Sequence, residues 1–241
     1  MHDGDARKRR LGIAGGRLAI GRRLDAPLAV DAQAAELDRR LVGDAAVRTL
    51  DREGPDLWVF ADSVAAVRRM ADRLRGRRRR LSVLIEMGIA GGRAGVRTAE
   101  DAEAVASAVD QASSLTLAGV ALYEGVVAGA TDAEKVAAVR ALADLTRDVT
   151  ERLRPLLERT GIDEVIVSGG GSHYFDVVAD ELTRPWPAGL PVRVVLRSGA
   201  YISHDHGIYE RSSPFGLRAA PGGPRLRPAI EVWAPVLSLP E

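Results

Sequence analysis

The chain has 241 residues, enough to bury one sizeable core, and its 34 Lys and Arg against 33 Asp and Glu leave a formal net charge of +1. This balance favours neither nucleic acid nor membranes nor acidic ligands as partners. The absence of cysteine excludes disulfides, thiolate metal ligands and cysteine nucleophiles. The chain also lacks an apolar run of the roughly 18 residues that a membrane span needs and lacks a recognisable export signal. We therefore expect a soluble, cytoplasmic protein.

The N-terminal part has little regular pattern. Residues 1–24 are rich in Arg and Gly and are predicted to form a disordered basic tail, whereas Asp25 to Arg52 have helical periodicity without a convincing strand before them. The hexapeptide Gly-Ile-Ala-Gly-Gly-Arg occurs at 12–17 and again at 88–93. Only the second copy follows a predicted strand, so we interpret the repetition as a coincidence of composition.

From about residue 55, short apolar runs alternate with longer segments of helical period, which is typical of parallel strands joined by crossover helices. The predicted strands are Leu57 to Ala61, Leu81 to Glu86, Leu115 to Tyr123, Glu164 to Val167 and Val192 to Leu196. The predicted helices are Ser63 to Arg75, Thr98 to Gln111, Asp132 to Arg159 with a kink or an end at Pro155, and Ser172 to Leu182. Thr98 and Ser172 are the expected N-caps of their helices. The predicted fold class is α/β.

The pattern changes after Tyr201, where Pro and Gly residues mark a loop before one more predicted strand at Ala229 to Leu237. We expect three parts: the basic tail at 1–24, an α/β barrel part at 25–205, and a crossover with the start of a β-rich domain at 206–241.

The sharpest local signal is Val-Ser-Gly-Gly-Gly-Ser at 167–172, between a predicted strand and a predicted helix. Glycines allow backbone N–H groups to approach a ligand closely, and the start of a helix adds further unsatisfied donors. The segment therefore predicts an anion cradle, most simply for phosphate. The alternative is a flexible turn with no ligand.

Three other predicted strands end in similar loops. Leu196 to Tyr201 places a glycine directly after a strand, the loop at 86–97 carries Arg93, and Tyr123-Glu124-Gly125 closes the strand between them. In eight-stranded α/β barrels, phosphate sites often lie in the loops after the last two strands. Taken singly, these loops have simpler interpretations. The loop at 196–201 could be a bend into the next domain, and Arg93 could be a solvated side chain.

The loops in their order along the chain resemble those of fold-type III enzymes, which use pyridoxal phosphate (PLP). The matching motifs are Glu-x-Gly-x-x-x-Gly-Arg-x-Gly-Val (86–96), Tyr-Glu-Gly (123–125), Ser-Gly-Gly-Gly-Ser (168–172), Arg-Ser-Gly-x-Tyr (197–201) and Ile-Glu-Val-Trp (230–233). They are most similar to the D-threonine aldolase, D-serine dehydratase and amino acid deaminase group, over roughly residues 57–238. The resemblance implies a barrel of the kind found in the N-terminal domain of alanine racemase.

The resemblance also implies which residues bind PLP. They are Arg93 and Tyr123 beside the ring, with Ser168, Gly169, Gly170, Gly171, Ser172, Gly199, Ala200 and Tyr201 around the phosphate. The substrate it implies is a D-amino acid, and the group also uses a divalent metal whose His and Cys or Asp ligands have no counterpart in this chain.

One family feature is absent. The group attaches PLP through a lysine in an Arg-Pro-His-x-Lys-Thr stretch after the first barrel strand, but the only lysines here are Lys8 in the basic tail and Lys135 in a predicted helix. Arginine cannot replace the lysine because it stays protonated. The chain also has five predicted strands, whereas a complete barrel has eight. Together with the missing lysine, this predicts a truncated barrel. Its open sheet edges are expected to favour association with another copy or with a complementing fragment.

Two charged motifs have simpler interpretations. His204-Asp205-His206 matches the crossover to the second domain rather than a metal pair, and Arg77 to Arg80 are interpreted as a solvated loop. Three functions remain open: a PLP-dependent enzyme of D-amino acids, a non-catalytic protein that binds PLP or phosphate, and a sugar-phosphate barrel that does not use PLP.

Overall fold

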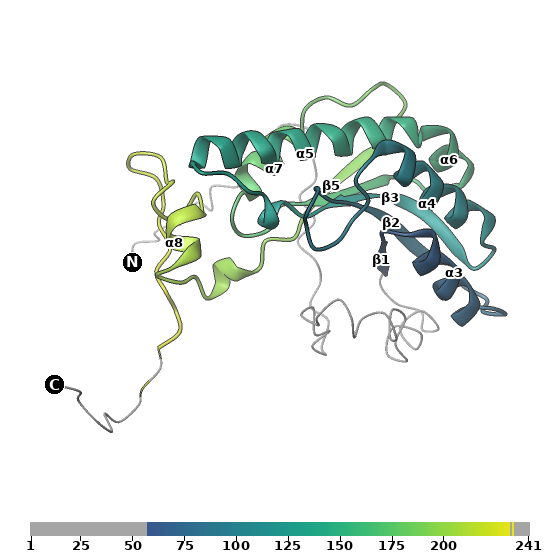
Figure 1. Ribbon diagram of the computed structural model, residues 1–241, viewed down its shortest axis with the longest axis horizontal. Coiled ribbons are helices and arrows are strands. Elements are labelled where there is room, and N and C mark those ends of the chain that lie inside the picture. The colour runs from purple at the N-terminus through teal and green to yellow at the C-terminus, as the bar shows by residue number, and fades with distance from the viewer. Residues whose placement is uncertain (1–56, 232, 234–241) are drawn as a thin grey trace, which may run out of the picture.

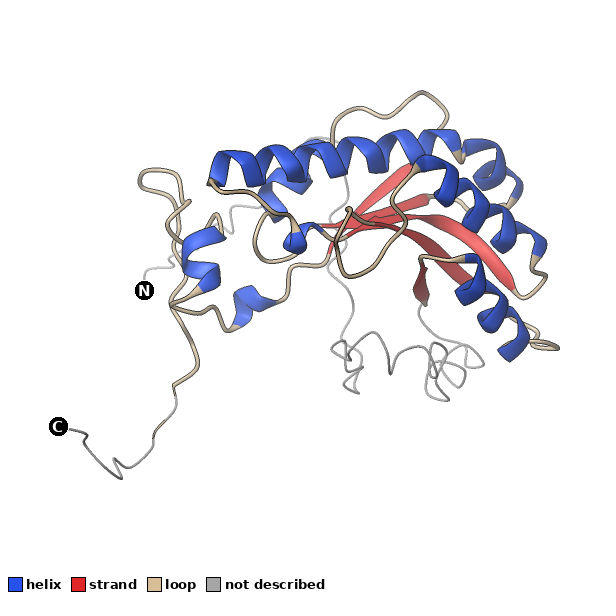
Figure 2. Cartoon of the chain, in the orientation of Figure 1, coloured by secondary structure: helices blue, strands red, loops and turns tan. Residues whose placement is uncertain are grey.

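The computed structural model describes residues 57–231 and 233. The predicted tail, the predicted helix at Asp25 to Arg52 and Lys8 lie outside these residues. In the described part, strands and helices alternate along the chain (Figures 1 and 2). The strands are β1 (Trp58–Ala61), β2 (Leu81–Met87), β3 (Leu115–Leu122), β4 (Val165–Gly169) and β5 (Val192–Leu196). The helices are α3 (Val64–Arg73), α4 (Ala99–Gln111), η1 (Glu124–Val126), α5 (Asp132–Arg152), α6 (Arg154–Arg159), α7 (Phe175–Leu182), η2 (Ala200–Ile202) and α8 (Ile208–Ser212).

The five strands form one sheet in the order β1-β2-β3-β4-β5, with every neighbouring pair parallel. Consecutive parallel neighbours joined by helices are the arrangement of a (β/α)8 barrel, so the sheet is consistent with part of such a barrel. The predicted α/β class is confirmed.

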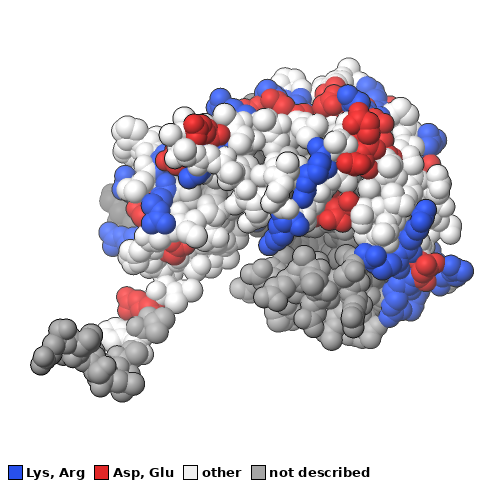
Figure 3. All heavy atoms as spheres, viewed as in Figure 1, with Lys and Arg blue, Asp and Glu red and all other residues white. Residues whose placement is uncertain are grey.

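The helices cover one face of the sheet, as Figure 2 shows, and the main core lies between these two layers. The core is built from alternate strand residues such as Leu81, Val83 and Ile85 of β2, which are completely buried. A smaller cluster on the opposite face contains Leu84 and Ile166, with Phe60 packed against it. Acidic and basic side chains are interspersed on the outer side of the helices (Figure 3), in agreement with the small net charge.

A bulge in β3 lets two strands approach closely. The register of β2 and β3 shifts between Val83 and Leu84, and Gly119 has a φ of +148°. A Cβ at Gly119 would lie 1.9 Å from the carbonyl oxygen of Ile166. Only glycine fits this position, because the backbones of β3 and β4 leave no room for a side chain.

The predicted break near Pro155 is confirmed, because Leu153 caps the end of α5 and Pro155 lies in the first turn of α6. Two other predicted elements differ from the structure. Helix α7 begins at Phe175 rather than at Ser172, whose side chain bonds to another loop. The predicted strand at Ala229 to Leu237 is not formed at residues 229–231 and 233, and its other residues lie outside the described part.

Two other predictions about the helices are confirmed. The Thr98 side chain accepts a hydrogen bond of 3.0 Å from the backbone N–H of Asp101, as expected for an N-cap. None of the described helices is long and apolar enough to cross a membrane.

Candidate functional site

The carboxyl ends of the parallel strands lie at one edge of the sheet and bring four loops together there. The loop after β3 contacts the loop after β4, since the backbone N–H of Gly170 donates to Glu124 Oε2 at 3.2 Å. The loop after β4 contacts the loop after β5, since the N–H of Ala200 donates to Ser172 Oγ at 2.9 Å. The Arg93 guanidinium, from the loop after β2, lies 5.2 Å from the centre of the Tyr123 ring. The predicted site residues thus come from loops that contact one another.

The glycine loop is tightly packed. A Cβ at Gly169 would lie 2.8 Å from Leu122 Cγ, and one at Gly170, where φ is +75°, would lie 2.6 Å from Leu196 Cδ2. A Cβ at Gly171 would lie 3.1 Å from Glu124 Oε1. Packing therefore accounts for glycine at the first two positions, and binding of an anion by this loop stays a prediction.

Ser172 is the residue that joins the two loops of the predicted phosphate site. Its side chain is buried, and besides the bond from Ala200 its hydroxyl lies 3.5 Å from Ser198 Oγ. Gly199 has no heavy atom within 4 Å of its added Cβ, so space is open beside this part of the loop. Tyr201, at the end of the same loop, is 44% exposed. The Ser168 hydroxyl donates to the carbonyl of Val195 at 3.1 Å, so it bonds within the sheet.

Glu124 is a buried acid that sequence analysis did not single out. It has no exposed surface, its Oε2 accepts the Gly170 N–H, and its Oε1 has no hydrogen-bond partner among the described residues. Burial raises the pKa of Glu124, although backbone N–H groups of Glu124 itself, Gly171 and Gly170 and the charge of Arg197 oppose this effect. In its neutral form, Glu124 would place no negative charge beneath the glycine loop.

Arg197 and Glu86 form a second buried group at the strand ends. Arg197 donates from Nη2 to the carbonyl of Leu122 at 2.5 Å, and its guanidinium lies 4.7 Å from the centre of the Phe60 ring. Burial lowers the pKa of Arg197, while Glu86 and Glu124 raise it. Burial likewise raises the pKa of Glu86, which Arg197 opposes. Side chains two residues apart in a strand lie on the same face of the sheet. Val195 packs against the smaller cluster on the face away from the helices, so the position of Arg197, two residues later, could have been predicted from the alternation of β5.

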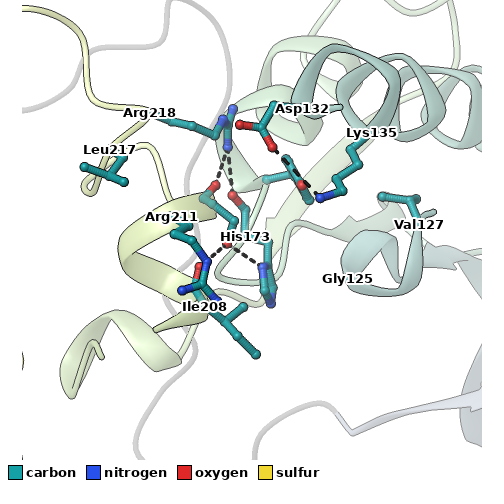
Figure 4. A pocket seen from close by; sticks show the side chains of 11 residues that line it. Gly125, Val127, Asp132, Lys135, His173, Ile208, Arg211, Leu217 and Arg218 are labelled. Atoms are coloured by element: carbon teal, nitrogen blue, oxygen red, sulfur yellow. Dashed lines mark hydrogen bonds and ion pairs between the residues drawn. The ribbon is translucent and has the colours of Figure 1, made fainter. Parts of the chain in front are cut away.

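Within the described residues, the Lys135 side chain makes no hydrogen bond or ion pair with the residues predicted to bind PLP. Lys135 lies in the first turns of α5, and its Nζ is 4.0 Å from Asp132 Oδ1. It lines a cavity of about 430 Å³ together with His173 and Arg218 (Figure 4).

The described residues contain no cluster of three or more acidic or histidine side chains suited to a metal ion. His204 bonds through Nε2 to Glu210 Oε2 at 3.0 Å, and Asp205 accepts the backbone N–H of Gly207 at 2.5 Å. These contacts connect the turn after η2 to α8.

The comparisons with known proteins agree with this arrangement of strands and loops. Residues 32–175, more than half of the chain, match the sequence model of the alanine racemase N-terminal domain. The chain belongs to this family. A comparison with curated protein sequences gives no match.

Solved structures resemble the chain over most of its length. D-threonine aldolase from Filomicrobium marinum is 26% identical with a TM-score of 0.51, and the similarity covers 72% of this chain and 42% of that one. D-threo-3-hydroxyaspartate dehydratase from Delftia sp. HT23 is 23% identical with a TM-score of 0.41, covering 73% and 42%. PipY of Synechococcus elongatus, solved with PLP bound, is 19% identical with a TM-score of 0.39, covering 58% of each chain. The chain thus spans about two fifths of the length of the aldolase and the dehydratase.

Proposed function

We propose that this chain binds PLP by its phosphate group between the glycine loop after β4 and the loop after β5. The observation that carries the proposal is the hydrogen bond from the Ala200 N–H to Ser172 Oγ, which places the two predicted phosphate loops side by side at the strand ends. The family match and the likeness to D-threonine aldolase support PLP as the phosphate compound. A sugar phosphate has no comparable support.

The residues proposed to hold PLP have separate tasks. Gly171 and Ser172 are proposed to supply backbone N–H groups and the Ser172 hydroxyl to the phosphate oxygens, and the Ala200 N–H, which donates to Ser172 Oγ, orients that hydroxyl. Arg93 and Tyr123, which stack on each other, border the ring. Bound PLP supplies an electron sink for chemistry at the α-carbon of an amino acid.

We propose a D-amino acid as the substrate class, with deamination, dehydration or aldol cleavage as the reaction of the complete enzyme. The second candidate is a protein that binds PLP without catalysis. The position of Lys135 in α5, paired with Asp132, favours the second candidate for this chain, because covalent attachment needs an amine beside the cradle.

The test is a titration of the purified chain with PLP and with pyridoxal, which lacks the phosphate, followed by absorbance or fluorescence. If the phosphate supplies most of the binding energy through two or more charged hydrogen bonds, PLP binds roughly 100-fold more tightly than pyridoxal. Equal affinities for the two compounds would remove the basis of the proposal.

The buried carboxyl of Glu124 makes the phosphate affinity depend on pH. In the folded chain the pKa of Glu124 lies above its usual value of 4.5, so the side chain ionises as the pH rises through this raised pKa. Its negative charge then opposes the phosphate. Above the pH at which Glu124 ionises, we expect Glu124→Gln to bind PLP roughly tenfold more tightly than the unchanged chain, which corresponds to about 1.4 kcal/mol and is measured by PLP titrations at increasing pH.

The pH profile distinguishes this effect from a purely structural one. The gain from Glu124→Gln is expected to shrink as the pH falls and to vanish below about 4.5, where both side chains are neutral. The stability of the fold depends on pH in the same direction. Because the pKa of Glu124 is higher in the folded chain than in the unfolded chain, the free energy of unfolding decreases as the pH rises above 4.5. The Glu124→Gln variant lacks this decrease. A ratio of PLP affinities that is independent of pH would refute this role of Glu124.

A further inference from the structure

The cavity of about 430 Å³ begins where the glycine loop ends, and the proposed PLP site does not use it. His173, the residue after Ser172, contributes to its lining. The other walls come from the start of α5, with Asp132 and Lys135, and from α8 and the segment after it, with Arg211 and Leu217. In Figure 4, His173 lies between Arg211 on one side and Lys135 on the other.

The hydrogen bonds of His173 determine which ring nitrogen carries the proton. The Ser212 hydroxyl donates its one hydrogen to the carbonyl of Ile208 at 2.7 Å, so it can only accept from His173 Nδ1, which lies 2.6 Å away. Nε2 therefore has a free lone pair in the neutral ring. Burial lowers the pKa of His173, opposed by the charge of Asp205, which favours the neutral ring. His173 is thus a fixed hydrogen-bond acceptor.

The cations of the cavity differ in how they are engaged. Arg218 donates to Asp176 Oδ2 at 2.8 Å and to the carbonyls of His173 and Ser212 at 2.9 and 2.6 Å, so it holds two walls together. The Arg211 guanidinium makes no hydrogen bond or ion pair within residues 57–231. Lys135 has only the 4.0 Å contact with Asp132, whose side chain is 69% exposed. The side chains of Arg211 and Lys135 are therefore available to an anionic ligand, and Asp132 is the acidic side chain of the lining.

We propose that this cavity is a second anion site, which binds a small organic carboxylate that also carries a hydroxyl group. Arg211 and Lys135 attract the carboxylate, and His173 Nε2 accepts a hydrogen bond from the hydroxyl. Ile208 and Leu217 provide apolar surface for the carbon atoms. The volume is within the range of small-molecule sites.

Lactate is a suitable probe, and the imidazole ¹⁵N signals of His173, assigned by comparison with His173→Gln, report its binding directly. At pH 7.5 we expect a saturable shift of the Nε2 signal with lactate, and roughly fivefold weaker binding of acetate because it lacks the hydroxyl. Arg211→Gln is expected to weaken lactate binding roughly tenfold. Arg225→Gln, on the same segment and exposed, is the matched control and should bind lactate normally.

A variant on the other loop of the proposed PLP site separates the two sites. Gly199→Val, where an added Cβ meets no heavy atom within 4 Å, is expected to fill the space proposed for PLP and to retain lactate binding. Absence of a saturable His173 shift, equal effects of Arg211→Gln and Arg225→Gln, or loss of lactate binding in Gly199→Val would each overturn the second site. None of these outcomes bears on whether PLP binds at the strand ends.

Discussion

Replacing Arg147 by Met lowers the free energy of unfolding by about 3 kcal/mol. This largely buried guanidinium donates to the carbonyls of Glu181 and Arg184 at 3.3 and 3.2 Å and of Pro185 at 2.7 Å. It also lies 4.0 Å from the centre of the Trp186 ring. Met keeps most of the apolar contact but removes the hydrogen bonds to the carbonyls at the end of α7. Each carbonyl that stays buried without a partner costs about 1–3 kcal/mol, and a carbonyl that reaches water costs less. The expected fall in melting temperature is roughly 6–12 °C.

Arg140→Met is the matched control on the same helix. Arg140 also contacts the end of α7, through Glu181 at 3.3 Å, but its side chain is 58% exposed. Exposed ion pairs contribute about 0–1 kcal/mol, so the melting temperature of this variant changes little. Equal effects of the two substitutions would show that Arg147 does not hold α7 against α5.

Gly171→Val abolishes most of the phosphate-dependent affinity for PLP. The new Cβ would lie 3.1 Å from Glu124 Oε1 and 3.3 Å from Tyr123 Cε2, and two methyl groups extend beyond it. The loop has to move, which displaces the N–H groups that we propose for the phosphate. Losing two charged hydrogen bonds corresponds to about 3 kcal/mol, or roughly a 100-fold weaker PLP titration.

Gly76→Asn serves as the glycine control for this experiment. Gly76 has a φ of +77° and no heavy atom within 4 Å of an added Cβ, and Asn tolerates this backbone conformation. Both variants should still unfold cooperatively, and only Gly171→Val should lose PLP affinity. Unchanged PLP binding in Gly171→Val would mean that the glycine loop is not the phosphate site.

The sequence was sufficient for the parallel sheet because each strand is a short apolar run followed by a helical period. It was less informative at helix ends. Ser172 has the composition of an N-cap, but its hydroxyl bonds to Ala200, which is 28 residues away. Local preference could not reveal that contact, since the competing partner is brought near only by the sheet.

The candidate site was predicted in part for the same reason. Glycines after a strand marked the loop, whereas Glu124 became notable only through its burial beneath Gly170 and Gly171. Arg197 was quoted within a motif but not as a site residue, and its burial against Phe60 depends on β1, at the opposite edge of the sheet. Which residues bind PLP remains a prediction, as does the division of the chain at residue 205.

We propose that the chain binds PLP at the strand ends through its phosphate, without a bond to a lysine. Borohydride reduction of the PLP-saturated chain, followed by intact-mass measurement and peptide mapping, tests it most directly. We predict saturable, reversible PLP binding with no reduced adduct on Lys135. A stoichiometric adduct on Lys135, or a failure to bind PLP at all, would contradict the account.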